Sequence, residues 1–254
     1  MTFPFIRTPA VLGTVLSLCC GLAQAQVAVT LNGNTGFRYT QDFNQLAAAP
    51  GTYRWYDNQI LPGWYLFNFV EQELVTPTYR VNNGDSASGS FYSYGLGSES
   101  DRALGAVGSG GAYFGTPAAG TNAGFMALAL RNTTGQPLTR LSLQYTGQQW
   151  RQGASDDLNT LVLQYGLGET IADVQTWVTP GAAFNFDSPS PELVTETGTA
   201  LNGRSAAASL VRGGSLNVAW APNAVLWVRW VLKNNYGYDH GLAIDNVVVT
   251  VPAP

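Results

Sequence analysis

Cysteine is nearly missing from this chain of 254 residues: only Cys19 and Cys20 occur, and both lie within residues 1–25. That segment has the pattern of a secretory signal peptide: a basic residue, a short apolar run and an Ala-Gln-Ala cleavage site. We expect its removal to leave residues 26–254 without a thiol, which excludes disulfides and thiolate metal ligands. A lipoprotein anchored at one of the cysteines is the alternative, but Leu18 stands where a small residue is needed.

Charge is also sparse. Charged residues make up 11% of the chain, the formal net charge is −4, and Lys233 is the only lysine. Binding of nucleic acid or of an anionic membrane surface requires clustered Lys and Arg side chains, and the sequence has no such cluster. After residue 25 no apolar run is long enough to cross a bilayer, so we expect no transmembrane segment in the mature chain. These absences predict a secreted, extracellular protein that does not bind nucleic acid.

Few residues are suited to catalysis. His240 is the only histidine, so any Ser-His or histidine–metal mechanism would have to include it. It stands beside Asp239 in a turn-rich loop and is expected to face solvent. Glu71 and Glu73 lie two residues apart, a spacing that puts both on one face of an extended segment, and glycoside hydrolysis requires such a carboxylate pair. The flanking sequence lacks the interposed acid of laminarinase-like enzymes, so a hydrolase is kept only as an alternative.

The sequence does contain short apolar or alternating runs, separated by Gly, Asn, Ser and Pro, and this texture is typical of a β-sandwich. No window of helical length has an apolar stripe with 3.6-residue spacing. Strands are expected at residues 27–31, 37–44, 64–70, 78–82, 90–95, 102–107, 123–131, 137–147, 158–166, 174–178, 207–219, 225–233 and 242–251. We predict one all-β domain over residues 26–254, a concanavalin-like or jelly-roll β-sandwich of two antiparallel sheets.

The last two predicted strands have the clearest patterns. In the first of them, Val228 and Trp230 alternate with Arg229, which predicts one apolar and one polar face. The strand at residues 242–249 is apolar on both faces apart from Asp245, and it is therefore expected in the centre of a sheet. A carboxylate among such neighbours needs a partner, because it is otherwise costly to keep ionised.

A series of short motifs extends over residues 39–251. They are Leu61-Pro62-Gly63-Trp64, Phe91-Tyr92-Ser93-Tyr94-Gly95, Asp101-Arg102-Ala103-Leu104-Gly105, Leu143-Gln144-Tyr145-Thr146-Gly147-Gln148-Gln149-Trp150-Arg151 and Gly241-Leu242-Ala243-Ile244-Asp245-Asn246. Together they resemble a family of exported bacterial sandwich domains of largely unassigned function, which often occur in proteins with a PEP-CTERM sorting tail. The chain stops at residues 251–254 (VPAP), without the apolar span and arginine cluster of such a tail. We therefore expect a freely released protein or a shortened chain.

The last motif is also similar to the final strand of MAM-like and other concanavalin-like jelly rolls, several of which hold calcium. In those proteins the first and last strands lie close enough to share an ion. The resemblance implies a structural calcium ion at Asp245 and Asp42, because calcium takes six to eight oxygen ligands from carboxylates and carbonyls. The alternatives are an ion pair between Asp245 and Arg229, or hydrogen bonds from loop amides to Asp245.

A second candidate site lies on the strand expected around residues 141–152. Gln144, Thr146, Gln148 and Trp150 alternate with apolar residues and so share one face. Amides that reach hydroxyl groups and an indole that stacks on a pyranose ring are typical of a sugar-binding surface. The alternative is a solvated face with Trp150 packed beneath a loop.

Export, the lack of a convincing catalytic set and the abundance of aromatic residues (12% of the chain) favour one function. We predict a secreted, non-catalytic binding or adhesion module that contacts polysaccharide, a cell surface or extracellular matrix. The alternatives are a glycan-active enzyme and a purely structural matrix component.

Overall fold

The structure is a computed structural model of the chain, and it describes residues 26–32, 34, 36–69, 78–154, 157–190 and 198–253. The predicted signal peptide, Glu71 and Glu73 lie outside these ranges. Within them the chain is built from strands and turns, with short 3-10 helices that include η2 (Ile171–Asp173) and η3 (Ala182–Phe184). None of the helices in these ranges has the length and apolar character needed to span a membrane.

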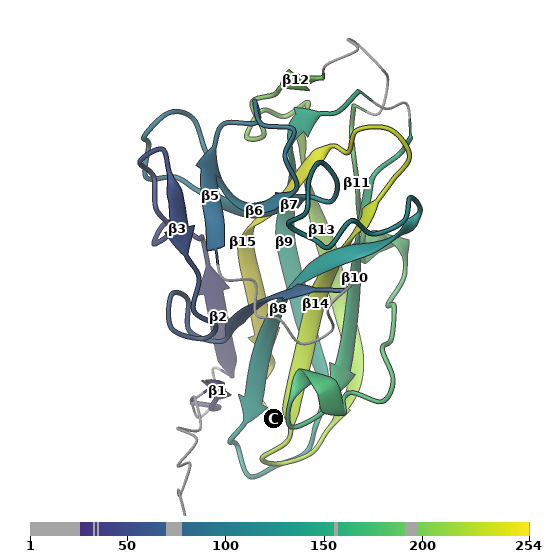
Figure 1. Cartoon of the computed structure of the whole chain (residues 1–254). Helices are drawn as coiled ribbons and strands as arrows, with labels where there is room; N and C mark the ends of the chain where they lie inside the picture. The colour runs from purple at the N-terminus through teal and green to yellow at the C-terminus, as the bar shows by residue number, and fades with distance from the viewer. Residues whose placement is uncertain are drawn as a thin grey trace, which may run out of the picture.

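Two β-sheets pack face to face, so the predicted all-β sandwich is confirmed (Figure 1). In chain order the strands are β1 (Val27–Val29), β2 (Phe37–Gln41), β3 (Thr52–Arg54), β4 (Trp64–Asn68), β5 (Thr78–Asn82), β6 (Ser90–Tyr94), β7 (Ala103–Val107), β8 (Thr121–Asn132), β9 (Leu138–Gln152), β10 (Thr160–Leu167), β11 (Phe186–Asp187), β12 (Thr199–Ala200), β13 (Ser209–Trp220), β14 (Val225–Asn234) and β15 (Gly241–Val251). One sheet has six strands in the order β1-β8-β14-β10-β11, and β4 also pairs with β8. The other has nine strands in the order β12-β9-β15-β7-β6-β5-β3, and β13 and β2 pair with β9 and β15.

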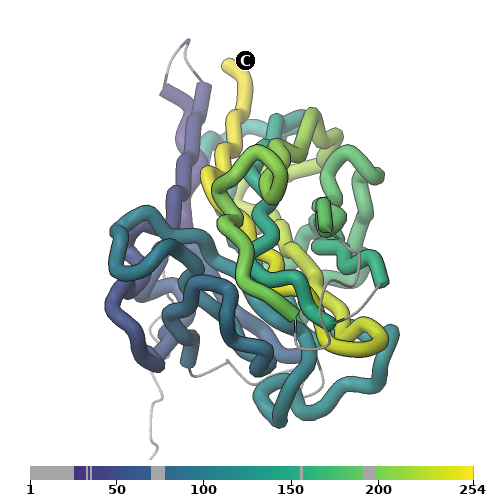
Figure 2. The backbone as a smooth tube through the Cα atoms, turned by 90° about the horizontal axis from the view of Figure 1, so that it is seen from above, coloured from purple at the N-terminus to yellow at the C-terminus, as the bar shows by residue number. Residues whose placement is uncertain are grey.

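Strand pairing is antiparallel apart from two short parallel pairs, β1 with β8 and β5 with β6. The strand with two apolar faces, β15, lies in the interior of the nine-stranded sheet between β9 and β7, as its pattern predicts. Seen from above, β2 and the end of β15 lie side by side (Figure 2), and their antiparallel pairing joins the first long strand to the last.

The core fills the space between the two sheets with aromatic rings. Trp64 of β4 stacks on Trp230 of β14, with ring centroids 5.6 Å apart, and Tyr145 of β9 meets Trp230 edge-on at 5.5 Å. Val228 belongs to the same buried cluster. The inward face predicted for Val228 and Trp230 is therefore confirmed, and Arg229 lies on the opposite side of β14.

Several strand predictions need correction. Residues 174–178 do not form a strand: only Val178 makes an isolated bridge, with Tyr165. The apolar residues of this segment, Val174 and Trp177, pack on the outer face of the six-stranded sheet instead. The strands β3, β11 and β12 were missed because two or three residues are too few to show alternation.

A β-bulge interrupts β15 next to the predicted metal ligand. The pairing of β15 with β9 shifts between Asp245 and Val248, and Asn246 within the bulge has a φ of 49°. Because of the extra residue, Ile244 and Val247 both enter the core, whereas Asp245 and Asn246 are both on the outer side.

Candidate functional site

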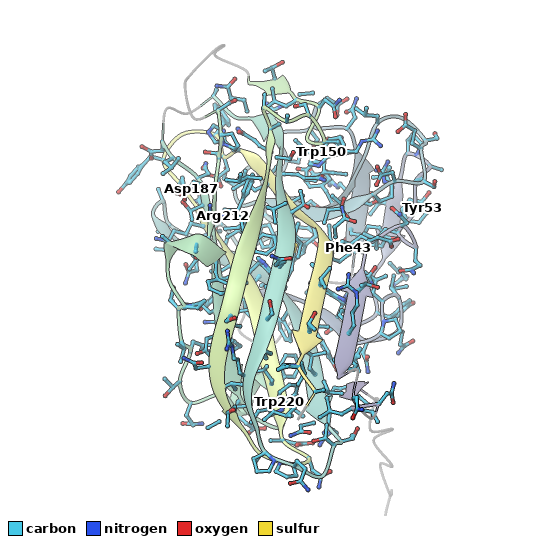
Figure 3. All side chains as sticks on the ribbon, turned by 180° about the vertical axis from the view of Figure 1, so that it is seen from behind. Phe43, Tyr53, Trp150, Asp187, Arg212 and Trp220 are labelled. Carbon is cyan, nitrogen blue, oxygen red and sulfur yellow. The ribbon has the colours of Figure 1, made fainter. Side chains whose placement is uncertain are left out.

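The predicted sugar-binding residues of β9 alternate with core residues such as Leu143 and Tyr145, so they lie on the outer face of the nine-stranded sheet. This sheet faces the viewer in Figure 3. Trp150 lies near one end of β9, far from Trp220 in this view, and it is only 1% exposed. Its indole stacks on Tyr94 with ring centroids 5.8 Å apart and an interplanar angle of 2°. A Cβ atom at Gly203 would lie 2.5 Å from the indole, which shows how closely the chain that follows β12 covers it.

Gln148 is buried with Trp150 and joins it to Asp245. The Trp150 indole N–H donates to Gln148 Oε1 at 2.7 Å, and Gln148 Nε2 donates to Asp245 Oδ2 at 3.2 Å. Asn246 completes the set, with its backbone N–H 2.7 Å from Asp245 Oδ1 and its side-chain amide 3.1 Å from Oδ2. The structure therefore links two predicted sugar-binding residues and a predicted metal ligand in one buried hydrogen-bond chain.

The prediction of an open face shared by Gln144, Gln148 and Trp150 is wrong. Gln144 is exposed, but Gln148 and Trp150 are covered by segments distant in sequence. Gly84 packs against the Trp150 carbonyl oxygen on one side, and the Leu201 N–H donates to that oxygen at 2.8 Å. The alternative weighed from the sequence, with Trp150 packed beneath a loop, is what the structure has.

The surroundings of Asp245 consist mainly of N–H donors. Its pKa is raised to about 7, mainly by burial and also by the charges of neighbouring Asp101 and Asp42, although the hydrogen bonds from Asn246 and Gln148 oppose the shift. In the described part of the chain, no three His, Cys, Asp or Glu side chains are grouped in a way that suits a metal ion. N–H groups stabilise a carboxylate but do not coordinate a cation, so these residues as arranged do not form a calcium cage.

Asp42 lies apart from this buried chain. It is exposed, its Oδ1 accepts the Asn44 N–H at 3.1 Å, and it lines an open polar groove of about 410 Å³ with Arg38, Gln45 and Asn246. The structure thus brings Asp42 near Asp245 without placing both in one coordination shell, and calcium at this position stays a prediction.

Two other expectations are wrong. Arg229 does not pair with Asp245, because β14 belongs to the other sheet and the Arg229 guanidinium contacts Gln164 and Trp177 there. His240 does not face solvent: it is 2% exposed, and its Nδ1 accepts the Gly153 N–H at 2.7 Å. The remaining alternative was hydrogen bonds from loop amides, and the structure has amide donors to Asp245 that belong instead to the strand residues Gln148 and Asn246.

The outer face of the six-stranded sheet carries a feature that the sequence analysis did not predict. On the outer side of the six-stranded sheet, alternate residues of β4 and its extension place Tyr65, Phe67 and Phe69 in one row, each of them half-buried. Phe67 pairs across the strands with Phe125 of β8, and their rings stack with centroids 4.8 Å apart. Phe69 meets Phe125 edge-on at 5.2 Å.

Arg229 lies next to these rings, in the middle of the sheet. Its strand neighbours are Ala127 of β8 and Gln164 of β10, so a small side chain separates Arg229 from the β4 aromatics. The guanidinium carbon lies 3.6 Å from the centroid of the Trp177 ring, which reaches over it from the segment after η2, and 5.0 Å from that of Phe125. Such cation–π contacts hold a partly desolvated arginine in place.

These side chains form a groove of about 240 Å³, which is lined by Phe67, Asn68, Phe69, Phe125, Ile171, Ala172 and Arg229. Its walls are flat aromatic rings, and its polar groups are few and fixed, which is the composition of small-molecule binding sites. A larger groove of about 390 Å³, between β10 and the end of β13, lacks a charged side chain and has Tyr165 as its only ring. We therefore take the aromatic groove, with Arg229 at its edge, as the candidate functional site.

The sequence held a signal for this site. The alternation of Tyr65, Phe67 and Phe69 with buried residues is visible in the sequence, as is the placement of Arg229 opposite Trp230. What it did not show is that β4 and β14 share a sheet and are separated only by β8. The polar face predicted for β14 is consequently an aromatic one.

No protein-family model and no curated protein sequence matches the chain. Solved structures with a similar arrangement of strands include the K3 cleaved adhesin domain of Lys-gingipain from Porphyromonas gingivalis, with a TM-score of 0.41, 11% identity and coverage of 79% of this chain and 99% of that one. The CBM22-1-GH10 modules of Clostridium thermocellum endo-1,4-beta-D-xylanase 10B give a TM-score of 0.35 at 7% identity, over 81% of this chain and 28% of that one. A putative sugar-binding protein from Bacteroides thetaiotaomicron gives 0.28 at 9% identity, over 91% and 95% of the two chains. These values are too low to transfer a ligand or an activity, and the chain is similar to these proteins only in being a β-sandwich.

Proposed function

We propose that this protein is a non-catalytic, secreted carbohydrate-binding module that holds a glycan in the aromatic groove of the six-stranded sheet. The observation that carries the proposal is the row of Phe67, Phe69 and Phe125 beside Arg229, in a groove of about 240 Å³. Flat rings at a sheet surface offer the C–H faces of a pyranose an apolar platform, and fixed polar groups at the edge reach its hydroxyl groups.

The exposure of the rings supports a ligand rather than a purely structural role for them. Phe67 and Phe69 are only half-buried, although both pack against the buried Phe125. Each therefore keeps a part of its apolar surface in contact with solvent next to a hollow. Binding of a ring of similar width would remove that surface from water, at about 25 cal/mol for each Å² covered.

The groove also has fixed polar edges. Gln164 accepts two hydrogen bonds from Arg229, at 2.9 and 2.6 Å, and its amide nitrogen lies 3.4 Å from Thr179 Oγ1. Because both ends of the amide are engaged, the Arg229 side chain is held in one orientation before a ligand arrives. Preorganisation of this kind reduces the ordering cost of binding.

A glycan array followed by affinity electrophoresis tests the proposal. We expect the purified protein to be retained by at least one polysaccharide. Phe67→Ala and Phe69→Ala should each weaken retention about tenfold or more, because an aromatic ring that the ligand covers contributes a large share of the binding free energy. Tyr238→Ala is the matched control, because Tyr238 is a 56% exposed aromatic outside the groove. Retention that survives both phenylalanine substitutions, or no retention by any glycan, would refute the proposal.

A further inference from the structure

The charge of Arg229 has no counter-charge among the described residues. The ion pairs in that part of the chain join Arg131 to Glu169 and Arg204 to Glu99 and Asp101, and none involves Arg229. The hydrogen bonds of Arg229 both go to a neutral acceptor, Gln164 Oε1.

The way in which Arg229 is held leaves one edge of its guanidinium available. Nε and Nη2 donate to Gln164 Oε1, which occupies the edge that these two nitrogens share. A guanidinium has five N–H donors in a rigid fork, so the edge formed by Nη1 and the second N–H of Nη2 is not used by Gln164. Nη1 makes no hydrogen bond to any other described residue, and Arg229 lines the aromatic groove.

From this geometry we propose that the groove selects acidic glycans, polysaccharides built from uronic acids, and that Arg229 binds their carboxylate groups through its free edge. This inference rests on the proposed glycan-binding function and narrows it to one class of ligand. The Nη1–Nη2 edge matches a carboxylate, which can accept two parallel N–H bonds from it.

The aromatic neighbours of Arg229 strengthen its attraction for an anion. Trp177 covers one face of the guanidinium and displaces water from it, with the ring centroid 3.6 Å from the guanidinium carbon. Burial lowers the pKa of Arg229 to about 10, so the group is charged at neutral pH but incompletely solvated. A bound carboxylate would supply the counter-charge in a site where charges are screened less than at an open surface.

Carboxyl reduction gives the matched ligands for the test, since it converts each uronic acid to its neutral sugar and leaves the linkages unchanged. Polygalacturonate and polymannuronate are each titrated into the purified protein beside their own carboxyl-reduced forms, by calorimetry. We expect at least one acidic polymer to bind about tenfold more tightly than its reduced form. Raising the salt from about 0.05 M to about 0.5 M should reduce that ratio.

Substitutions test whether Arg229 is responsible for the preference for acidic polymers. Arg229→Gln should bring the acidic polymer to within about twofold of its reduced form. Arg140→Gln is the matched control, because Arg140 is exposed on the other sheet and donates to Ser215. A thermal melt of each variant shows that it is folded, and the comparison of the wild-type protein with the two forms of each polymer does not depend on any variant.

The possible outcomes distinguish a failure of the acid preference from a failure of glycan binding itself. Equal binding of the acidic and reduced polymers, or binding only of neutral glycans on the array, would overturn the acid preference and leave glycan binding in place. A preference that persists in Arg229→Gln would also overturn the inference, because another group would then be responsible. Binding of no glycan would refute both this inference and the proposed function.

Discussion

Replacement of Trp150 is the sharpest test of the structure, because sequence and structure disagree about this residue. An exposed stacking ring would be dispensable for stability, whereas the structure buries Trp150 against Tyr94 beneath Gly203 and bonds its indole to Gln148. We therefore predict that Trp150→Ala lowers the free energy of unfolding by about 3–5 kcal/mol, the usual cost of removing a large buried aromatic side chain.

The matched substitution Trp150→Phe separates the two parts of that cost. Phenylalanine keeps a ring over Tyr94 but removes the indole N–H, which leaves Gln148 Oε1 without its donor. A buried acceptor left unpaired costs about 1–3 kcal/mol, so the phenylalanine variant should fall between the wild type and the alanine variant.

The assay is thermal and urea unfolding followed by far-UV circular dichroism, which does not depend on the indole that is removed. In a domain of this size each kcal/mol lowers the melting temperature by about 2–4 °C, so Trp150→Ala should lower it by about 10 °C. Gln144→Ala, at an exposed position on the same strand, is the control and should change stability by less than about 0.5 kcal/mol. A change below about 2 °C in Trp150→Ala would show that the indole is exposed, and the account of this face would be wrong.

Two further predictions concern the buried carboxylates. The pKa of Asp239 and that of Asp245 are each raised to about 7, mainly by burial. Between about pH 4 and pH 7 the folded protein therefore holds protons on these carboxyl groups that the unfolded chain has lost. The free energy of unfolding should be greatest below about pH 4 and should fall up to about pH 7, by about 1.4 kcal/mol per pH unit for each group. Urea midpoints measured across this range should show a shallower decline in Asp239→Asn, and an unchanged slope would contradict the assignment. If calcium binds at Asp42 and Asp245, a chelator should lower the melting temperature by several degrees, and calcium should restore it better than magnesium. Asp245→Asn should abolish this response, and Asp42→Asn should weaken it. A melting temperature indifferent to the chelator would leave Asp245 with only its amide donors.

Alternation in the sequence was sufficient to predict the long strands and their inward faces. The inward placement of Val228 and Trp230 followed from alternation, and the interior position of β15 followed from a run that is apolar on both faces; both patterns are local properties of a strand. Periodicity failed where a single residue changed the register. The bulge at Asn246 turns two successive residues of β15 outward, and no composition signal marks it.

The candidate site could not be predicted because it depends on which segments lie next to one another. Trp150 has the alternation of an exposed residue, but segments distant in the sequence, at Tyr94 and at Gly203, cover it. Arg229 has the pattern of a solvated charge, but Trp177 packs over it and the pairing of β4 with β8 brings Phe67 and Phe69 close to it, which makes it part of an aromatic groove. Loops and crossings of this kind are tertiary features, and single-sequence patterns do not report them.

Hydroxyl-radical footprinting with a bound glycan shows directly which sheet holds the ligand, because aromatic side chains react readily and each can be followed separately by mass spectrometry. We predict that saturating glycan protects Phe67 and Phe69 of the groove, and Trp177 beside them over Arg229, from oxidation, whereas Tyr238, exposed outside the groove, reacts as in the free protein. Unchanged oxidation of these three residues while the protein is saturated with glycan would show that the six-stranded sheet does not hold the ligand.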